Sequence, residues 1–266
     1  MSTTKNKVVE LSDADQVLQG EGLKYGTEHF PTETRVGKPI GAFYLYRTDG
    51  IFQSMDEVNA HVNKDGQLLQ PNAQPGDIRF KDLDGNVGDM DAGDKEYCGS
   101  GIPTLEANLN LSFGYKGFDL SIVLGSAWNF KLYNGNKYFY EGMNSKSNML
   151  KSTLNAWTPD NRNTDVPRAV YQDPNGNMKE SDRFLENGDF VRLRQAQLGY
   201  TLPKSLMQKF YIEKLRFYVS GENLFTITGY DGIDPEFSRA SVLNTGVDKL
   251  IYPFTRSFTV GAQLTF

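Results

Sequence analysis

The sequence predicts an all-β protein, namely a segment of an antiparallel transmembrane β-barrel with about six strands and long extracellular loops. Apolar and polar residues alternate over stretches of about nine to twelve residues, longer than the five or six of a typical soluble strand. The connections are unequal, because short turns at one end of the strands oppose long excursions at the other. No apolar run approaches the roughly 18 residues that a spanning helix needs.

Composition alone leaves two classes open. With 266 residues, 38% hydrophobic and 23% charged, the chain fits a soluble domain, but a barrel whose strands alternate also averages to a mean hydropathy near the observed -0.51. A net charge of -5 lacks the basic face that nucleic-acid binding needs, so no nucleic-acid partner is expected. Cys98 is the single cysteine and forms no internal disulfide.

The clearest element is a β-hairpin over residues 104–130. The stretch "TLEANLNLSFGY" places its apolar residues on one face, and "FDLSIVLGSAW" resumes the same alternation after a tight turn at Lys116 and Gly117. Two arms of about a dozen residues are long enough to cross a bilayer when tilted.

A strand pair is expected over residues 188–230 and a terminal strand over 254–266. The pair consists of "DFVRLRQAQLGYTLP" and "KLRFYVSGENLFTITGY", although the pattern around Arg192 and Arg194 alternates less cleanly. In "RSFTVGAQLTF" every second residue from Phe258 onward is apolar. An earlier strand is expected within "IGAFYLYRTDGIFQS".

Loops are expected to connect these strands. Residues 131–187 and 231–253 form long loops, residues 77–103 form an Asp/Gly-rich loop, and residues 1–35 form a partial strand and loop region. Aromatic residues gather near the strand ends, where interfacial girdles of a barrel lie, although they would equally fill a soluble core. These aromatic residues are Tyr115, Phe118, Trp128, Phe130, Tyr200 and Phe266.

Several segments together resemble one family, the SusC/RagA group of TonB-dependent outer-membrane transporters. The similarity covers nearly all of residues 36–266, in the family's order, and identifies this region as a C-terminal barrel segment. It rests on "VGKPIGAFYLYRTDGIFQS", "PGDIRFKDLDGNVGDMDAGDKEYCGSGIP", "NLSFGYKGFDLSIVLGSAWNFKLYN", "AWTPDNRNTDVPRA", "GDFVRLRQAQLGYTLPKSL", "LRFYVSGENLFTITGYDGIDPEF" and the terminal strand.

The resemblance implies a plugged barrel of about 22 strands in the bacterial outer membrane. Such a barrel imports glycans or peptides together with a SusD-like surface lipoprotein, and it contacts membrane lipid and lipopolysaccharide. The TonB complex powers import through an N-terminal part, which this sequence lacks together with the plug. The remaining barrel and plug are therefore expected partners, and the isolated segment is expected to be inactive.

The beginning of the chain shows no export signal, because "MSTTKNKVVELSDADQ" has no basic start followed by an apolar core. This is expected of an internal start in a longer reading frame. A split subunit, a truncated gene and a remnant without function all remain open. Phe266 resembles the terminal aromatic residue by which outer-membrane proteins are recognised for insertion.

The stretch "DLDGNVGDMDAGD" is a candidate Ca²⁺ loop, since closely spaced carboxylates supply the oxygen ligands of a hard cation. It departs from the EF-hand pattern, having Val87 at the sixth position and lacking the glutamate at the twelfth. A solvated turn held by side-chain to backbone hydrogen bonds is the alternative. The candidate ligands are Asp82, Asp84, Asn86, Asp89, Asp91 and Asp94.

No nucleophile, zinc or phosphate-loop motif is present, so the sequence predicts no catalytic residue and no enzyme. Cargo contacts are expected from aromatic and amide side chains of the long loop, unless these pack against the lipoprotein or each other. The candidates are Tyr133, Asn134, Asn136, Tyr138, Tyr140, Glu141 and Trp157. The competing function is a soluble Ca²⁺-dependent carbohydrate-binding β-sandwich.

Overall fold

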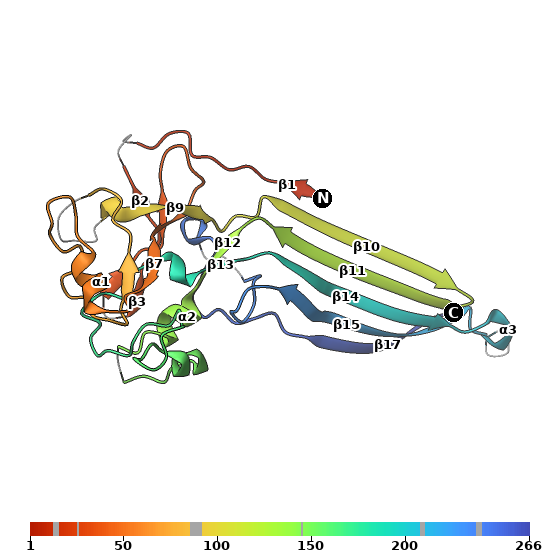
Figure 1. The fold of residues 1–266 in the computed structure, drawn as a ribbon. Coiled ribbons are helices and arrows are strands. Elements are labelled where there is room, and N and C mark those ends of the chain that lie inside the picture. Colours follow the sequence, from red (N-terminus) through yellow and green to blue (C-terminus); the bar gives the residue numbers. More distant parts are fainter. Residues whose placement is uncertain (13–15, 26, 86–91, 145, 208–210, 238–240) are drawn as a thin grey trace.

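A computed structural model describes residues 1–12, 16–25, 27–85, 92–144, 146–207, 211–237 and 241–266. The protein has two parts, a long antiparallel sheet and a folded body at one of its ends (Figure 1). The body contains the segments that connect the sheet strands at that end, together with most of the first hundred residues.

The large sheet has six strands in the order β1-β10-β11-β14-β15-β17. Every neighbouring pair is antiparallel, so the predicted hairpin, strand pair and terminal strand all form and pair in sequence order. The strands are β1 (Ser2–Thr3), β10 (Leu105–Tyr115), β11 (Phe118–Trp128), β14 (Phe190–Thr201), β15 (Lys214–Thr228) and β17 (Ser257–Thr265).

The tight turn of the first hairpin lies far from the body. Lys116 has a φ of 46° and Gly117 a φ of 88°, the two positive values that a type I′ turn requires. Glycine adopts such a conformation without steric cost, and the turn sets Tyr115 opposite Phe118. Short connections therefore lie at this end of the sheet, together with helix α3 (Lys204–Met207), and long connections at the other (Figure 1).

One face of the large sheet is apolar and exposed. Leu109 is 51% exposed, Phe217 51% and Val260 83%, because no second sheet among the described residues covers them. A β-sandwich would bury these side chains between two sheets, so the structure contradicts the sandwich alternative. Cross-strand partners continue the band across the sheet: Leu109 with Leu124, Leu120 with Leu198, Leu198 with Val219, and Val219 with Val260.

The opposite face of the sheet is polar. Its rows include Asn108, Asn110, Ser112, Ser121, Gln197, Ser220 and Thr259. Arg216 of β15 donates two hydrogen bonds on this face to the carboxylate of Asp119 of β11, across the intervening strand β14. A sheet with one apolar and one polar face, both without a covering layer, has the pattern of a barrel wall.

The body is built from small sheets and short helices. Its four-stranded sheet has the order β2-β5-β6-β9, and the described residues form three smaller sheets beside it, namely β13-β12-β16, β3-β4 and β7-β8. The strands are β2 (Leu18–Gln19), β5 (Thr32–Thr34), β6 (Ala42–Tyr46), β9 (Lys95–Ser100), β3 (Leu23–Tyr25), β4 (Thr27–His29), β7 (Thr48–Ile51), β8 (Ile78–Phe80), β12 (Lys131–Asn134), β13 (Leu185–Asn187) and β16 (Val247–Asp248).

The body has its own hydrophobic core, with contributions from segments that are far apart in the sequence. Strand β6 reads AFYLY and is buried on both faces, which explains its continuous apolar run. The main cluster contains Leu23, Phe43, Leu45, Tyr133, Tyr138, Met178, Phe184 and Val247. The segments predicted as long loops are thus largely folded into a packed body.

The earlier strand expected between residues 40 and 54 forms as β6 and β7, but both pair within the body and neither joins the large sheet. The body's helices α1 (Met55–Ala60) and α2 (Gly135–Tyr140) are six residues each. Within the described ranges, none of the helices has the length and apolar character that crossing a membrane would require.

Candidate functional site

Four ionisable side chains meet where the polar face of the large sheet joins the body. Arg192 and Arg194 belong to β14, whereas Asp234 and Glu236 belong to the connection between β15 and β17. We call these four residues the arginine–carboxylate cluster. It attaches the long connection to the sheet.

A β-bulge brings both arginines to the same face. Leu193 pairs with Leu124 and Gln195 with Val123, so Arg194 is an extra residue without a partner on β11. Such a bulge redirects the side chain of the extra residue. A Cβ atom on Gly125 would lie 2.1 Å from Arg194 Nε, which shows that the arginine occupies the space over this glycine.

Arg192 and Asp234 form the inner pair of the cluster, and both side chains are almost completely buried. Arg192 is 2% exposed and donates from Nη2 to Asp234 Oδ1 and from Nε to Thr226 Oγ1 at 3.0 Å. Its Cζ atom lies 5.2 Å from the centre of the Phe254 ring. Removing one partner of such a pair leaves a buried uncompensated charge, which costs about 3–5 kcal/mol.

Arg194 and Glu236 form the outer pair of the cluster, and both line a cavity. Arg194 Nη2 donates to Glu236 Oε1 at 2.8 Å, and both side chains are partly exposed. Beside them lies a cavity of 280 Å³ between the starts of β10 and β14, with Glu106, Asn108, Phe130 and Phe190 in its lining. The cavity therefore joins charged and apolar walls at the end of the polar face that lies next to the body.

Sequence reasoning did not identify this site. Its signal was the interrupted alternation around Arg192 and Arg194, which is how a bulge looks in a sequence. The acidic partners lie 42 residues away from the arginines, and no local pattern connects them.

Most of the predicted cargo residues are buried in the body. Tyr133 and Tyr138 are fully buried, and their ring centres lie 6.3 Å apart and 5.7 and 5.6 Å from that of Phe184. Burial raises the pKa of both tyrosines far above the ordinary value. In the structure these aromatic side chains pack against each other, and their direct contact with cargo stays a prediction.

Three further candidates bind other parts of the body. Asn134 caps α2 by accepting a hydrogen bond from the Lys137 backbone N–H at 3.2 Å. Glu141 accepts from Arg183 at 2.6 Å, and Trp157 donates from Nε1 to the side chain of Gln53 at 3.0 Å.

Asn134, Glu141 and Trp157 are 1%, 4% and 7% exposed. Their side chains are engaged within the body, and direct cargo contact by them likewise stays a prediction. Of the seven candidates, Asn136 is half-buried and Tyr140 is 38% exposed, so their contact with cargo stays a prediction.

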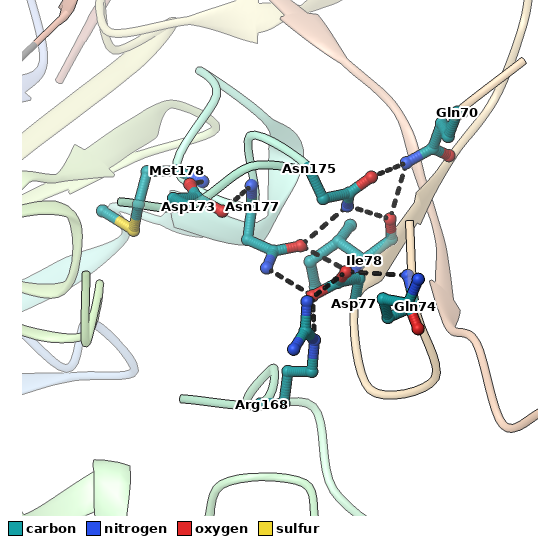
Figure 2. A network of polar contacts seen from close by, with 9 residues as sticks. All are labelled: Gln70, Gln74, Asp77, Ile78, Arg168, Asp173, Asn175, Asn177 and Met178. Atoms are coloured by element: carbon teal, nitrogen blue, oxygen red, sulfur yellow. Dashed lines mark hydrogen bonds and ion pairs between the residues drawn. The ribbon is translucent and has the colours of Figure 1, made fainter. Parts of the chain in front are cut away.

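A polar network holds two chain segments of the body together (Figure 2). Asp77 is fully buried and accepts hydrogen bonds from Arg168 Nε at 2.7 Å and from Asn177 Nδ2 at 2.9 Å. Asn177 Oδ1 in turn accepts from the backbone N–H of Ile78 at 2.8 Å. Figure 2 shows the 173–178 turn directed at the 74–78 segment, and the network fixes both without leaving the charge of Asp77 unpaired.

The candidate calcium residues are partly described. Carboxylate oxygens of Asp82, Asp84 and Asp94 all lie within 4.8 Å of one another. Asp94 is 1% exposed and accepts from the backbone N–H of Leu83 at 2.8 Å, while Asp82 accepts from that of Gly85 at 2.7 Å. These bonds fit the turn interpretation, and the three carboxylates also fit a cation.

The other predicted ligands, Asn86, Asp89 and Asp91, lie outside the described residues. Ca²⁺ binding therefore stays a prediction. Phe266 is 84% exposed, and its role as an insertion signal likewise stays a prediction.

No family model matches the chain. Among curated proteins it is similar to TonB-dependent receptor P3 of Formosa agariphila, at 31% identity over 271 residues, which cover 100% of this chain and 26% of the receptor. It is also similar to TonB-dependent receptor SusC of Bacteroides thetaiotaomicron, at 26% identity over 98% of this chain and 23% of that protein.

Solved structures show the same similarity as the curated proteins. A RagAB peptide importer in its "open-open" state matches 98% of this chain and 25% of the importer chain, with a TM-score of 0.70 at 25% identity. This chain belongs to the SusC/RagA group of TonB-dependent receptors. The predicted fold class, an antiparallel transmembrane barrel segment, is confirmed by the six-stranded sheet and by this structural match.

This SusC/RagA-type chain spans about a quarter of the length of the relatives it matches. The similarity covers the body as well as the sheet, because nearly the whole chain aligns with the importer. The relatives' function describes longer proteins, so activity, cargo and partners are proposals for this chain.

Proposed function

We propose that this chain forms the C-terminal quarter of a TonB-dependent barrel that imports nutrients across the bacterial outer membrane. The observation that carries the proposal is the uncovered apolar face of the large sheet, opposite an equally uncovered polar face. Lipid tails would cover the first face, and a lumen would lie against the second.

The strand dimensions support a membrane position. Strands β10 and β11 have 11 residues each, and at about 3.3 Å per residue this gives roughly 36 Å. Tilted by about 40°, such a strand spans roughly 28 Å, close to the apolar band of about 25 Å in outer-membrane barrels. Phe118 and Tyr200 contact each other at one end of this band, with ring centres 4.5 Å apart, as in an aromatic girdle.

The proposed partners follow from this geometry. The remaining barrel strands would pair with the outer edge of β17 and with the part of the β10 edge that β1 leaves open, and the plug would lie on the polar face. The body would lie at the cell surface, where a SusD-like lipoprotein would contact it and lipopolysaccharide would surround the strand ends. Glycans or peptides are the proposed cargo, the TonB complex the proposed energy source, and no enzymatic activity is part of the proposal.

Paired substitutions in the full-length transporter test the membrane position. Ile122 lies on the apolar face near the middle of β11, and Ser121 lies next to it on the polar face. Ile122→Arg should destabilise the barrel by about 2–4 kcal/mol, whereas Ser121→Arg should leave insertion unchanged. The measurement is the heat-modifiable folded fraction in outer-membrane preparations.

Equal folded fractions for the two variants would contradict the proposed membrane position. Cargo uptake that continues unchanged in cells without TonB would contradict the proposed energy source. Both measurements use the wild-type transporter as the reference.

A further inference from the structure

Another cavity, of 580 Å³, lies where the large sheet meets the body. It is bounded by the chain that follows β1, by β9 and its connection to β10, by the segment between β11 and β12, and by the segment between β13 and β14. Figure 1 shows β9 running into β10 beside the end of β11 and the beginning of β12. The cavity therefore belongs to the junction that joins the strand ends to the body.

Strand alternation places Lys131 and the cavity on the side of the apolar face. Leu132 of β12 is buried in one cluster with Ala127, which lies on the polar face of β11. Neighbouring residues of a strand point to opposite sides, so Lys131 points to the apolar side, where it pairs with Asn187. Lys131 and Asn187 both line the cavity.

The level of the cavity corresponds to the lipid headgroups in the proposed membrane position. Trp128 is exposed at the end of β11, opposite Leu105, where an aromatic girdle of a barrel marks the edge of the hydrocarbon. Lys131 follows three residues later, which is roughly 10 Å along an extended chain and about 8 Å along the membrane normal at a tilt of about 40°. The headgroup layer is about 5–8 Å thick on each side, so Lys131 lies at its level.

The cavity carries more positive than negative charge. The charged residues of its lining are Lys5, Lys131 and Asp189, so the net charge is +1. Asp189 is already engaged, because Oδ1 accepts from the Asn129 backbone N–H at 2.7 Å and Oδ2 from Asn187 Nδ2 at 3.2 Å. Within the described part of the chain, neither of the two lysines takes part in an ion pair.

A third lysine lies beside the cavity. Lys38 Nζ is 4.5 Å from the centre of the Tyr97 ring, and Tyr97 lines the cavity. The aliphatic stem of Lys131 covers Gly99 of the same strand, because a Cβ atom there would lie 3.0 Å from Lys131 Cγ. Long lysine side chains pack their stems on such surfaces and keep the charged end at the water interface.

We propose that this cavity binds the phosphate group of an anionic lipid of the outer leaflet, the phosphorylated headgroup of lipopolysaccharide. Lys5 and Lys131 donate to the phosphate oxygens, and the acyl chains lie on the apolar face beyond Trp128. Hydrogen bonds from ammonium to phosphate are charge-assisted and about twice as strong as neutral ones. The inference deepens the proposed membrane position and rests on it, because the phosphate reaches this level only if the apolar face meets lipid.

The test uses the full-length transporter that contains this chain, purified in detergent and freed of bound lipid. Microscale thermophoresis compares three probes: monophosphoryl lipid A, its dephosphorylated form and inorganic phosphate. The phosphorylated lipid should bind about tenfold more tightly than the dephosphorylated one, because each lysine near an anionic headgroup contributes. It should also bind more than about tenfold more tightly than inorganic phosphate, which has no chains to cover the apolar face.

Two variants locate the effect. Lys5→Gln combined with Lys131→Gln should remove the preference for the phosphorylated lipid. Lys116→Gln is the matched control, since Lys116 is also an exposed lysine beside an aromatic ring, with Nζ 5.2 Å from the centre of the Tyr115 ring, but lies at the opposite end of the sheet. The preference should persist in this control. Because the lipids are compared on the unmodified protein, a folding failure of a variant leaves the test decisive.

Equal affinity for the two lipids overturns the proposal, as does a preference that survives in the double variant. Equal affinity for the phosphorylated lipid and inorganic phosphate overturns the assignment to a lipid. Failure of the transport proposal looks different, because uptake would then be missing while the lipid preference of the purified protein remained. A transporter that imports its cargo but does not distinguish the two lipids retains its function and loses this site.

Discussion

At the residue scale, Glu180 holds together two strands of the body through one carboxylate. His29 Nδ1 donates to its Oε2 at 2.5 Å, and Lys95 Nζ lies 2.5 Å from its Oε1. Burial favours a higher pKa, but the hydrogen bond from His29 and the charge of Lys95 outweigh it and hold the pKa of Glu180 below its ordinary value.

This shift predicts a pH dependence for the body. A lowered carboxyl pKa means that the stabilisation is complete above the unfolded value of 4.5 and is lost as pH falls through the folded value. Glu180→Gln should lower the free energy of unfolding at pH 7 by about 3 kcal/mol and remove this part of the acid sensitivity. Thermal unfolding in detergent, followed by the fluorescence of buried Trp157, measures both effects.

Glu96→Gln provides the matched control. Glu96 pairs with Arg47 at 2.9 Å on the surface and is 47% exposed, so its removal should cost under about 1 kcal/mol. If Glu180→Gln and the wild type lose stability in parallel between pH 7 and pH 4, Glu180 does not carry the acid sensitivity.

The surroundings of single residues were the hardest feature to predict from the sequence. The sequence places Tyr133 and Trp157 in polar, loop-like surroundings, and aromatic residues there suit either cargo binding or packing. The deciding contacts come from distant segments, such as Leu23, whose carbonyl accepts from Tyr138 at 3.3 Å, and Gln53, which accepts from Trp157. Burial of this kind depends on tertiary structure and leaves no local pattern.

At the element scale, the period-two pattern was sufficient to predict β10, β11, β15 and β17 and the existence of β14, but not the bulge at Arg194. Each long strand pairs with its neighbour in the large sheet, and alternation of apolar and polar residues favours the observed register, which the tight turn also fixes for β10 and β11. The strands of the body were not predictable in the same way. They have two to six residues, and several pair across long separations, as β12 does with β16.

Strand β14 and the connection after β15 are expected to separate when the buried ion pair is broken. Asp234→Ala leaves the buried Arg192 with only its longer ion pair to Glu236 at 3.5 Å, at a cost of about 3 kcal/mol. Hydrogen–deuterium exchange should therefore accelerate in β16 and in its partner β12, while β10 and β11 stay protected.

Arg194→Ala is the comparison for this prediction, because its pair with Glu236 is 38% and 27% exposed and contributes about 1 kcal/mol at most. Equal acceleration in both variants would show that the bulge itself, and not the buried pair, holds the connection. Acceleration throughout the sheet in Asp234→Ala would show that the body and the sheet unfold as one unit.

At the scale of the whole molecule, the segment of residues 245–248 packs closely against two segments of the body near the strand ends. A Cβ atom on Gly101 would lie 2.1 Å from the Thr245 carbonyl oxygen, and one on Gly135 would lie 1.8 Å from that of Asp248. Only glycine permits such close backbone approaches. The last connection of the chain therefore passes close to two earlier segments, around Gly101 and Gly135, and the body depends on all three.

The sheet, in contrast, lacks covering layers. Val260 is 83% exposed and Phe258 75%, and the far edge of β17 has no partner strand among the described residues. Exposed apolar faces and open strand edges promote association in water, whereas a bilayer or detergent covers the apolar face. We therefore expect the 266-residue chain alone to aggregate in detergent-free buffer and to show cooperative β-structure melting only with an amphiphile.

Size-exclusion chromatography and far-UV circular dichroism, with and without detergent, measure this outcome. Val260→Asp combined with Val219→Asp is a useful comparison, because these cross-strand neighbours lie on the apolar face and their charges should reduce aggregation in buffer while impairing detergent-dependent folding. A monodisperse, folded wild-type monomer in buffer would mean that the apolar face is compatible with water. The assignment of that face to lipid would then fail, whatever the family of the chain.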